Sequence, residues 1–80
     1  MTPAEVKPRL ETVFRDIFED PSLVIHDTTT ADDIEAWDSL THIDLIVEVE
    51  RTFGIKLSTG EVRGLKNVGD FIALIARKAP

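Results

Sequence analysis

Residues 37–54 decide the fold of this 80-residue chain, and they read WDSLTHIDLIVEVERTFG. Asp38 is a preferred N-cap residue, and Gly54 is the residue type that most readily adopts the left-handed conformation just past a helix C-terminus. Between them, apolar residues recur at the spacings of three and four that are typical of an amphipathic helix. The stretch therefore predicts a helix that begins after Asp38 and runs to about Phe53.

This predicted helix is apolar on two sides, which a helix with only one buried face does not need. At roughly 100° per residue, the broad face that packs on the core consists of Leu45, Ile46, Val49 and Phe53. Nearly opposite lies a smaller apolar strip, which consists of Leu40, Ile43 and Val47. Its charged border consists of Asp44, Glu48 and Arg51. Two interpretations remain open: a loop covers the apolar strip, or a partner docks there, as on many apolar patches with a polar rim.

A first helix is predicted close to the start of the sequence. Thr2, Pro3 and Glu5 combine a capping box with a proline in the first turn. The buried stripe that follows has helical spacing and consists of Val6, Leu10, Val13, Phe14, Ile17 and Phe18. Pro8 lies within this segment, removes a backbone donor and disfavours a helical Lys7. We therefore expect a kinked or irregular first turn.

A long connection without sustained periodicity runs from Asp20-Pro21 to Trp37. Connections longer than roughly 12 to 15 residues in a compact domain are usually functional or disordered. Asp32 and Asp33, after Thr30, predict a single helical turn within it. Its apolar residues predict that it packs onto the core, and these are Leu23, Val24, Ile25, Ile34 and Trp37.

The remainder of the chain predicts two further helices. Ser58 and Glu61 form a second capping box, which begins a short helix that carries Val62 and Leu65. Asn67 caps the last helix, whose buried stripe consists of Val68, Phe71, Ile72 and Ile75. No segment alternates as a strand does. We therefore predict an all-α four-helix bundle with a short third helix and a long loop between helices one and two.

Composition and charge restrict the classes of function. Eighty residues are enough for one domain, 1–80, and its 42% hydrophobic and 30% charged residues are typical of a soluble globular chain. Without cysteine there is no disulfide, thiolate metal site or cysteine nucleophile. The net charge of −6 argues against nucleic acid and anionic membrane as partners, and in favour of basic protein surfaces. No apolar run is long enough to span a bilayer, and no signal peptide is apparent, so we expect a cytoplasmic monomer.

Ser39 is the residue best placed to carry chemistry. It stands in the first turn of the 37–54 helix, where backbone N–H groups and the helix dipole favour an attached or bound anion. Alternatively, Ser39 merely helps Asp38 to begin the helix, and the pattern alone leaves both interpretations open. His42 is its helical neighbour but falls on the core side. Because no glycine-rich elbow surrounds Ser39, a serine hydrolase is disfavoured.

Metal binding is equally disfavoured. The acidic residues of the long connection lack the glycine-centred spacing of a calcium loop, and they are Asp32, Asp33 and Glu35. We interpret them as a solvated acidic run that begins a helical turn. We therefore expect no metal site in this chain.

The sequence Trp37-Asp38-Ser39-Leu40, at the start of an acidic helix that follows a helix and a long loop, resembles the acyl carrier protein family. The resemblance extends over essentially the whole chain. It implies that Ser39, flanked by Asp38 and Leu40, receives 4′-phosphopantetheine from coenzyme A through a separate Mg²⁺-dependent phosphopantetheinyl transferase. The thiol of the arm would carry an acyl group as a thioester. The chain would then be a carrier without catalytic residues of its own.

The same resemblance implies that the second helix docks on basic patches of partner enzymes. That role falls on Leu40, Ile43, Asp44, Val47 and Glu48. The implied partners are the transferase, a loading ligase for acyl or aminoacyl groups, and downstream synthases or transferases. Trp37 and Arg51 depart from the carriers of central fatty acid synthesis, which favours a specialised lipid, polyketide or related pathway. The alternatives are an aminoacyl or peptidyl carrier and an acidic helical interaction module that is never modified.

Overall fold

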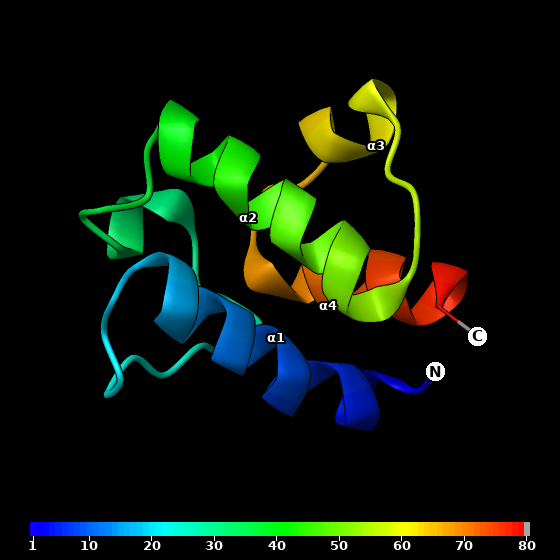
Figure 1. Ribbon diagram of the computed structural model, residues 1–80, viewed down its shortest axis with the longest axis horizontal. Helices are drawn as coiled ribbons and strands as arrows, with labels where there is room; N and C mark the ends of the chain where they lie inside the picture. The colour runs from blue at the N-terminus through cyan, green and yellow to red at the C-terminus, as the bar shows by residue number, and fades with distance from the viewer. Residues whose placement is uncertain (80) are drawn as a thin grey trace.

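The computed structural model describes residues 1–79, which form four α-helices and one short 3-10 helix (Figure 1). The elements are α1 (Pro3–Ile17), η1 (Ala31–Asp33), α2 (Ser39–Phe53), α3 (Thr59–Arg63) and α4 (Val68–Lys78). No strand occurs in residues 1–79. The predicted all-α bundle, with its short third helix and long first connection, is confirmed.

Side-chain caps begin the helices at the predicted residues, which are Thr2, Asp38, Ser58 and Asn67. In the α1 capping box the Glu5 N–H donates to the Thr2 hydroxyl at 3.2 Å, and the Thr2 N–H donates to the Glu5 carboxylate at 3.0 Å. Gly54 ends α2 with a φ of 66°, in the left-handed region where a side chain would be strained. Local sequence signals therefore determine where the helices begin and where α2 ends.

Pro8 lies inside α1, and the irregular first turn that we expected is wrong. The capping box is complete, and the helix is continuous from Pro3 to Ile17. Pro8 removes the donor that the Ala4 carbonyl would otherwise receive, but Ala4 and Pro8 are both exposed. A carbonyl on an exposed face is open to solvent and does not need this bond, so its loss does not interrupt the helix.

The core forms where α1 packs against both α2 and α4, and Figure 1 shows α1 and α2 running in opposite directions along the molecule. Its fully enclosed side chains come from these three helices and from the long connection: Val6, Leu10, Phe14, Ile25, Leu45, Val49, Val68, Phe71 and Ile75. By contrast, α3 contributes no buried residue. The side chain of Lys78 ties it to α4 by donating to Glu61 at 2.6 Å and to the Lys56 carbonyl at 2.5 Å.

The long connection between α1 and α2 packs down, and it includes the predicted helical turn as η1. Ile25 and Ile34 are buried, and Leu23 and Trp37 are half-buried against the core. Val24 is 55% exposed, so the prediction that it packs inward is wrong. Val24 lies outside any helix or turn, and its two neighbours, Leu23 and Ile25, pack on the core. Because Leu23 and Ile25 face the core, Val24 faces solvent.

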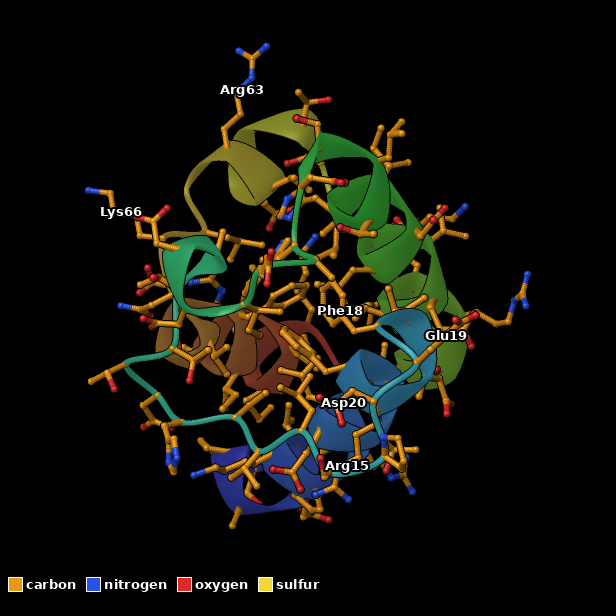
Figure 2. The ribbon with its side chains drawn as sticks, turned by 90° about the vertical axis from the view of Figure 1, so that its left-hand side faces the viewer. Arg15, Phe18, Glu19, Asp20, Arg63 and Lys66 are labelled. Atoms are coloured by element: carbon orange, nitrogen blue, oxygen red, sulfur yellow. The ribbon has the colours of Figure 1, made fainter. Side chains whose placement is uncertain are left out.

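Hydrogen bonds hold this connection near its start and at its middle. Where it leaves α1, Arg15 Nε donates to the Leu23 carbonyl at 2.7 Å. Figure 2 shows this end of the molecule, with Phe18 turned towards the interior. Further along, the N–H groups that open α4 donate into the connection: Val68 to the Thr29 carbonyl and Gly69 to the Asp27 carbonyl, each at 2.8 Å. The connection is therefore a packed support for the start of α2.

Candidate functional site

Asp38 and Thr41 form the cap at the start of α2. The Asp38 carboxylate accepts the backbone N–H groups of Leu40 at 2.9 Å and Thr41 at 3.0 Å. In return, the Asp38 N–H donates to the Thr41 hydroxyl at 2.8 Å, and that hydroxyl donates to the Ala36 carbonyl at 2.8 Å. The pKa of Asp38 is lowered by hydrogen bonds, first from the Thr41 N–H and then from the Thr41 hydroxyl and the Leu40 N–H. Asp38 is therefore ionised at neutral pH.

Ser39 takes no part in these capping bonds and is exposed to solvent. The idea that it merely helps Asp38 to begin the helix is therefore unnecessary, because Thr41 has that role. The structure also changes one sequence expectation. Two of the N–H groups that we expected to favour an anion at Ser39 are already donated to Asp38. What remains at Ser39 is an accessible primary hydroxyl at the positive end of the helix dipole.

Trp37 anchors the chain immediately before this cap. Its indole lies edge-on to the ring of Phe14, with ring centroids 5.2 Å apart and planes at 88°. The centroid of the Phe18 ring lies 6.2 Å from that of the indole. Both phenylalanines belong to the end of α1 or its cap. Trp37 thus joins the start of α2 to α1, as expected of a large apolar anchor.

His42, in the first turns of α2, pairs with the Trp37 side chain. The Trp37 indole N–H donates to Nδ1 of His42 at 3.0 Å, and the two rings are nearly parallel, 18° apart, with centroids separated by 6.0 Å. Partial burial lowers the pKa of His42, and the bond accepted at Nδ1 favours the same neutral form. The helical angle correctly placed His42 towards the interior, but nothing in the sequence pattern indicated that it pairs with Trp37.

An open depression of about 420 Å³ lies beside Ser39, and its lining is Ala31, Trp37, Asp38, Ser39 and His42. It combines the start of η1, the last residues of the connection and the first turn of α2. In Figure 1 these segments meet at the upper left, away from both chain ends. A group attached to the Ser39 oxygen would therefore begin next to an aromatic surface.

The apolar strip of α2 is uncovered. Leu40 is 75% exposed, Ile43 60% and Val47 49%, so the interpretation in which the long loop covers them is wrong. On the opposite side of α2, Leu45, Val49 and Phe53 are buried, and Ile46 packs beside them. Both faces of α2 are thus as the helical angle predicted.

The charged border is uneven around this strip. Asp44 is exposed, whereas Glu48 lies 3.6 Å from the guanidinium of Arg51 in an ion pair three residues along the helix. Arg51 itself is largely exposed. The unpaired negative charge therefore lies towards the Ser39 end of the strip, and a partly neutralised pair lies towards its far end.

Other site types find no support in residues 1–79. No cluster of His, Asp and Glu is arranged there to hold a metal ion. No helix in that range is long and apolar enough to cross a membrane.

Comparison with known proteins places this geometry in a class. A family model described as the phosphopantetheine attachment site matches residues 8–75. The solved structure of holo acyl carrier protein from Geobacter metallireducens superimposes with a TM-score of 0.85 at 46% sequence identity, covering 89% of this chain and 82% of that one. The fold and the match define a carrier with a covalent 4′-phosphopantetheine cofactor, and not an enzyme.

Curated relatives agree with this class. Acyl carrier protein from Thermosynechococcus vestitus is 30% identical over 79 residues, which cover 98% of this chain and 96% of that protein. Acyl carrier protein from Rhodococcus erythropolis is 34% identical over 58 residues, and the match spans 72% of this chain and 63% of the relative, just under two thirds of its length. The chain belongs to the acyl carrier protein family.

Proposed function

We propose that Ser39 is the residue that accepts 4′-phosphopantetheine, and that the chain carries thioester-bound intermediates of a specialised lipid, polyketide or related pathway. The observation that carries the proposal is the exposed Ser39 hydroxyl, which the α2 cap leaves free, at the end of an uncovered apolar strip. It fits the family's cofactor, because a phosphodiester needs an accessible hydroxyl and room for the arm. The depression beside Ser39 provides that room.

In the attachment reaction, the Ser39 oxygen attacks the phosphorus on the pantetheine side of the coenzyme A diphosphate. A new bond forms between that oxygen and phosphorus, and the diphosphate P–O bond breaks to release adenosine 3′,5′-bisphosphate. The hydroxyl proton passes to a base of the phosphopantetheinyl transferase. When bound, the group supplies a terminal thiol that holds the cargo as a thioester.

We further propose that partner enzymes dock on Leu40, Ile43 and Val47, and that Asp44 and Glu48 steer basic groups of the partner into place. These partners are the transferase, a loading ligase and downstream synthases or transferases. A small apolar patch with charges at its rim suits short encounters, because rim charges act mainly on association rates. A carrier needs such encounters, since it must leave each partner after one transfer.

The specialised pathway is proposed from two residues. Trp37 before Asp38-Ser39, and Arg51 within the acidic helix, depart from the pattern of carriers in central fatty acid synthesis. In this structure both have contacts of their own, with His42 and Glu48 respectively. An aminoacyl cargo is the alternative, and loading assays with acyl and aminoacyl ligases distinguish the two.

The attachment proposal is tested by treating the purified chain with coenzyme A, Mg²⁺ and a broad-specificity phosphopantetheinyl transferase. Wild type and Ser22→Ala are expected to gain the mass of one phosphopantetheinyl group, and Ser39→Ala none. Ser22 is a matched control because it is also exposed, but it lies in the long connection. A folded Ser39→Ala protein that still gains the group would contradict the assignment.

A further inference from the structure

Positive charge is concentrated in the last third of the chain. Residues 55–80 contain five of the nine basic residues but only two of the fifteen acidic ones, although the whole chain has a net charge of −6. Arg63, Lys66 and Arg77 are exposed, and none of them forms an ion pair within residues 1–79. In Figure 2, Arg63 projects outward at the top and Lys66 at the left, whereas α2 lies on the right. The region of α3, the turn after it and α4 therefore attracts negative charge in an otherwise acidic molecule.

A groove of about 330 Å³ lies between α3 and α4 in this region. Its uncharged lining consists of Gly60, Gly64, Leu65, Ala73 and Leu74. Arg77 lines the same groove, so that a cation stands beside apolar side chains. The volume is at the small end of the range for ligand pockets, which suits one or two apolar side chains better than a whole cofactor.

The two carboxylates that line the groove, Glu61 and Asp70, are already hydrogen-bonded within the chain. Glu61 accepts the Lys78 ammonium at 2.6 Å and the Ser58 N–H at 2.9 Å. Asp70 accepts the backbone N–H of Lys66 at 3.2 Å. Because Lys78 belongs to α4 and Glu61 to α3, their ion pair also holds the two walls together. The groove is therefore formed before any partner arrives, and its unpaired cations are free to meet carboxylates from outside.

We propose that this α3–α4 groove is a second docking site, and that it takes an acidic segment of a partner protein that presents an apolar side chain. The apolar side chain enters the groove beside Leu65 and Leu74. Carboxylates of the same segment pair with Arg77 and, in the adjoining turn, with Arg63 and Lys66. Complementary charge steers such a segment to this region and away from α2, whose border is mostly acidic.

This site leaves the rest of the carrier surface accessible. None of the residues that line the groove belongs to α2 or to the depression beside Ser39. A partner bound in the groove can hold the carrier while a different enzyme reaches Ser39 and the apolar strip of α2. The groove therefore suits retention of the carrier within an assembly, which docking on α2 does not give, because each enzyme must release α2 after its transfer.

NMR of the unmodified, ¹⁵N-labelled chain tests the site with a defined probe, a blocked peptide of sequence EELLEELLEELL at low salt. We expect shifts of the backbone amides in residues 60–66 and 73–77 and none in residues 40–48, and we expect the shifts to shrink at high salt. An absence of shifts in 60–66 and 73–77, or larger shifts in 40–48, would overturn the site. Because the chain is unmodified, the outcome is independent of attachment at Ser39.

A peptide of opposite charge, KKLLKKLLKKLL, tests the charge complementarity. We expect it to shift the amides of residues 40–48, on α2, and to leave those of 60–66 and 73–77 in place. Equal shifts by both peptides in 60–66 and 73–77 would show that apolar contact alone drives binding, and would overturn the assignment of an acidic partner.

Two arginine variants with the same net charge separate the groove from the charge of the whole chain. Arg77→Gln removes the cation that lines the groove, and Arg9→Gln removes another exposed arginine, on α1. We expect Arg77→Gln to weaken binding of the glutamate peptide by about fivefold, the value of one exposed ion pair, and Arg9→Gln to leave it unchanged. Equal weakening by the two variants, or none by Arg77→Gln, would contradict the proposal.

Gly60→Glu provides a variant that fills the groove without disturbing the fold. A Cβ atom at Gly60 meets nothing within 4 Å, so a side chain is accommodated there, and circular dichroism confirms that the variant folds. We expect it to weaken binding of the glutamate peptide by at least about tenfold, because it adds bulk and a like charge to the site. A folded Gly60→Glu protein that binds the peptide as wild type does would overturn the groove as the docking site.

Discussion

Replacement of Gly69 by alanine is expected to destabilise the fold through the support of the functional site. A Cβ atom at Gly69 would lie 2.9 Å from the Asp27 carbonyl oxygen and 3.2 Å from Oδ1 of Asn67. The first contact is with backbone, which cannot rotate away as a side chain would. The connection must therefore move outward, which weakens the 2.8 Å bonds from Gly69 to Asp27 and from Val68 to Thr29.

The magnitude follows from two opposing effects. Overpacking with displacement of backbone typically costs about 1 to 3 kcal/mol. Alanine gains up to about 1 kcal/mol over glycine within a helix, and less in the first turn where Gly69 stands. We therefore expect Gly69→Ala to lower the free energy of unfolding by about 1 to 2 kcal/mol.

Urea denaturation followed by circular dichroism measures this change. With a slope of about 1 kcal/mol per molar urea for a small domain, the midpoint should fall by about 1 to 2 M. Gly60→Ala is the matched control, since a Cβ there meets nothing within 4 Å, and we expect it to be neutral or stabilising. A Gly69→Ala protein as stable as wild type, or two variants with equal shifts, would refute the packing argument.

Three further predictions concern charge and burial. Lys78 lowers the pKa of Glu61 to about 2, so the folded-state pKa lies below the unfolded value. The stabilisation by this pair should therefore be present above about pH 4.5 and lost as the pH falls towards 2. An NMR titration that finds an unshifted pKa for Glu61 would contradict the pair. Burial lowers the pKa of His42, so the stability contributed by its neutral form should be present above about pH 6.5 and lost as the pH falls below that value. In the same titration, the NMR signal of the Trp37 indole N–H should shift as its hydrogen bond to His42 breaks. A His42 that titrates as an exposed histidine would argue against the bond. Arg51→Ala frees Glu48 and should raise the rate of modification at low salt by less than about fivefold, since exposed ion pairs are worth up to about 1 kcal/mol. This gain should vanish at high salt, and a salt-independent change would contradict electrostatic steering.

The parts of the fold that the sequence predicted are those that local chemistry decides. Caps at Thr2, Asp38, Ser58 and Asn67 act over three residues, and a glycine just past a helix acts alone, so each is visible without knowledge of the rest of the chain. The two faces of α2 follow from the helical period in the same way. The two errors, at Pro8 and Val24, both depend on which side of an element faces water, and single-residue preferences do not contain that information.

The candidate site also has features that could be predicted from local sequence and features that depend on distant parts of the chain. A second apolar strip could be predicted, because helical angle sorts Leu40, Ile43 and Val47 from the core face, but the sequence pattern left open whether the long connection covers it. The Trp37–His42 hydrogen bond could not, because it depends on how the long connection approaches α2. The role of Thr41 in the cap was missed as well, although a threonine three residues after Asp38 is a signal that a search for capping partners would have found.

The central claim is that Ser39 bears the phosphopantetheine arm. Fragmentation mass spectrometry of the tryptic peptide 16–51, after modification of the wild-type chain, tests it most directly, because this peptide contains both Ser22 and Ser39. The account predicts that every fragment that retains Ser39 carries the added group and that fragments ending before it do not. Modification located on Ser22, or on a peptide that lacks Ser39, would contradict it.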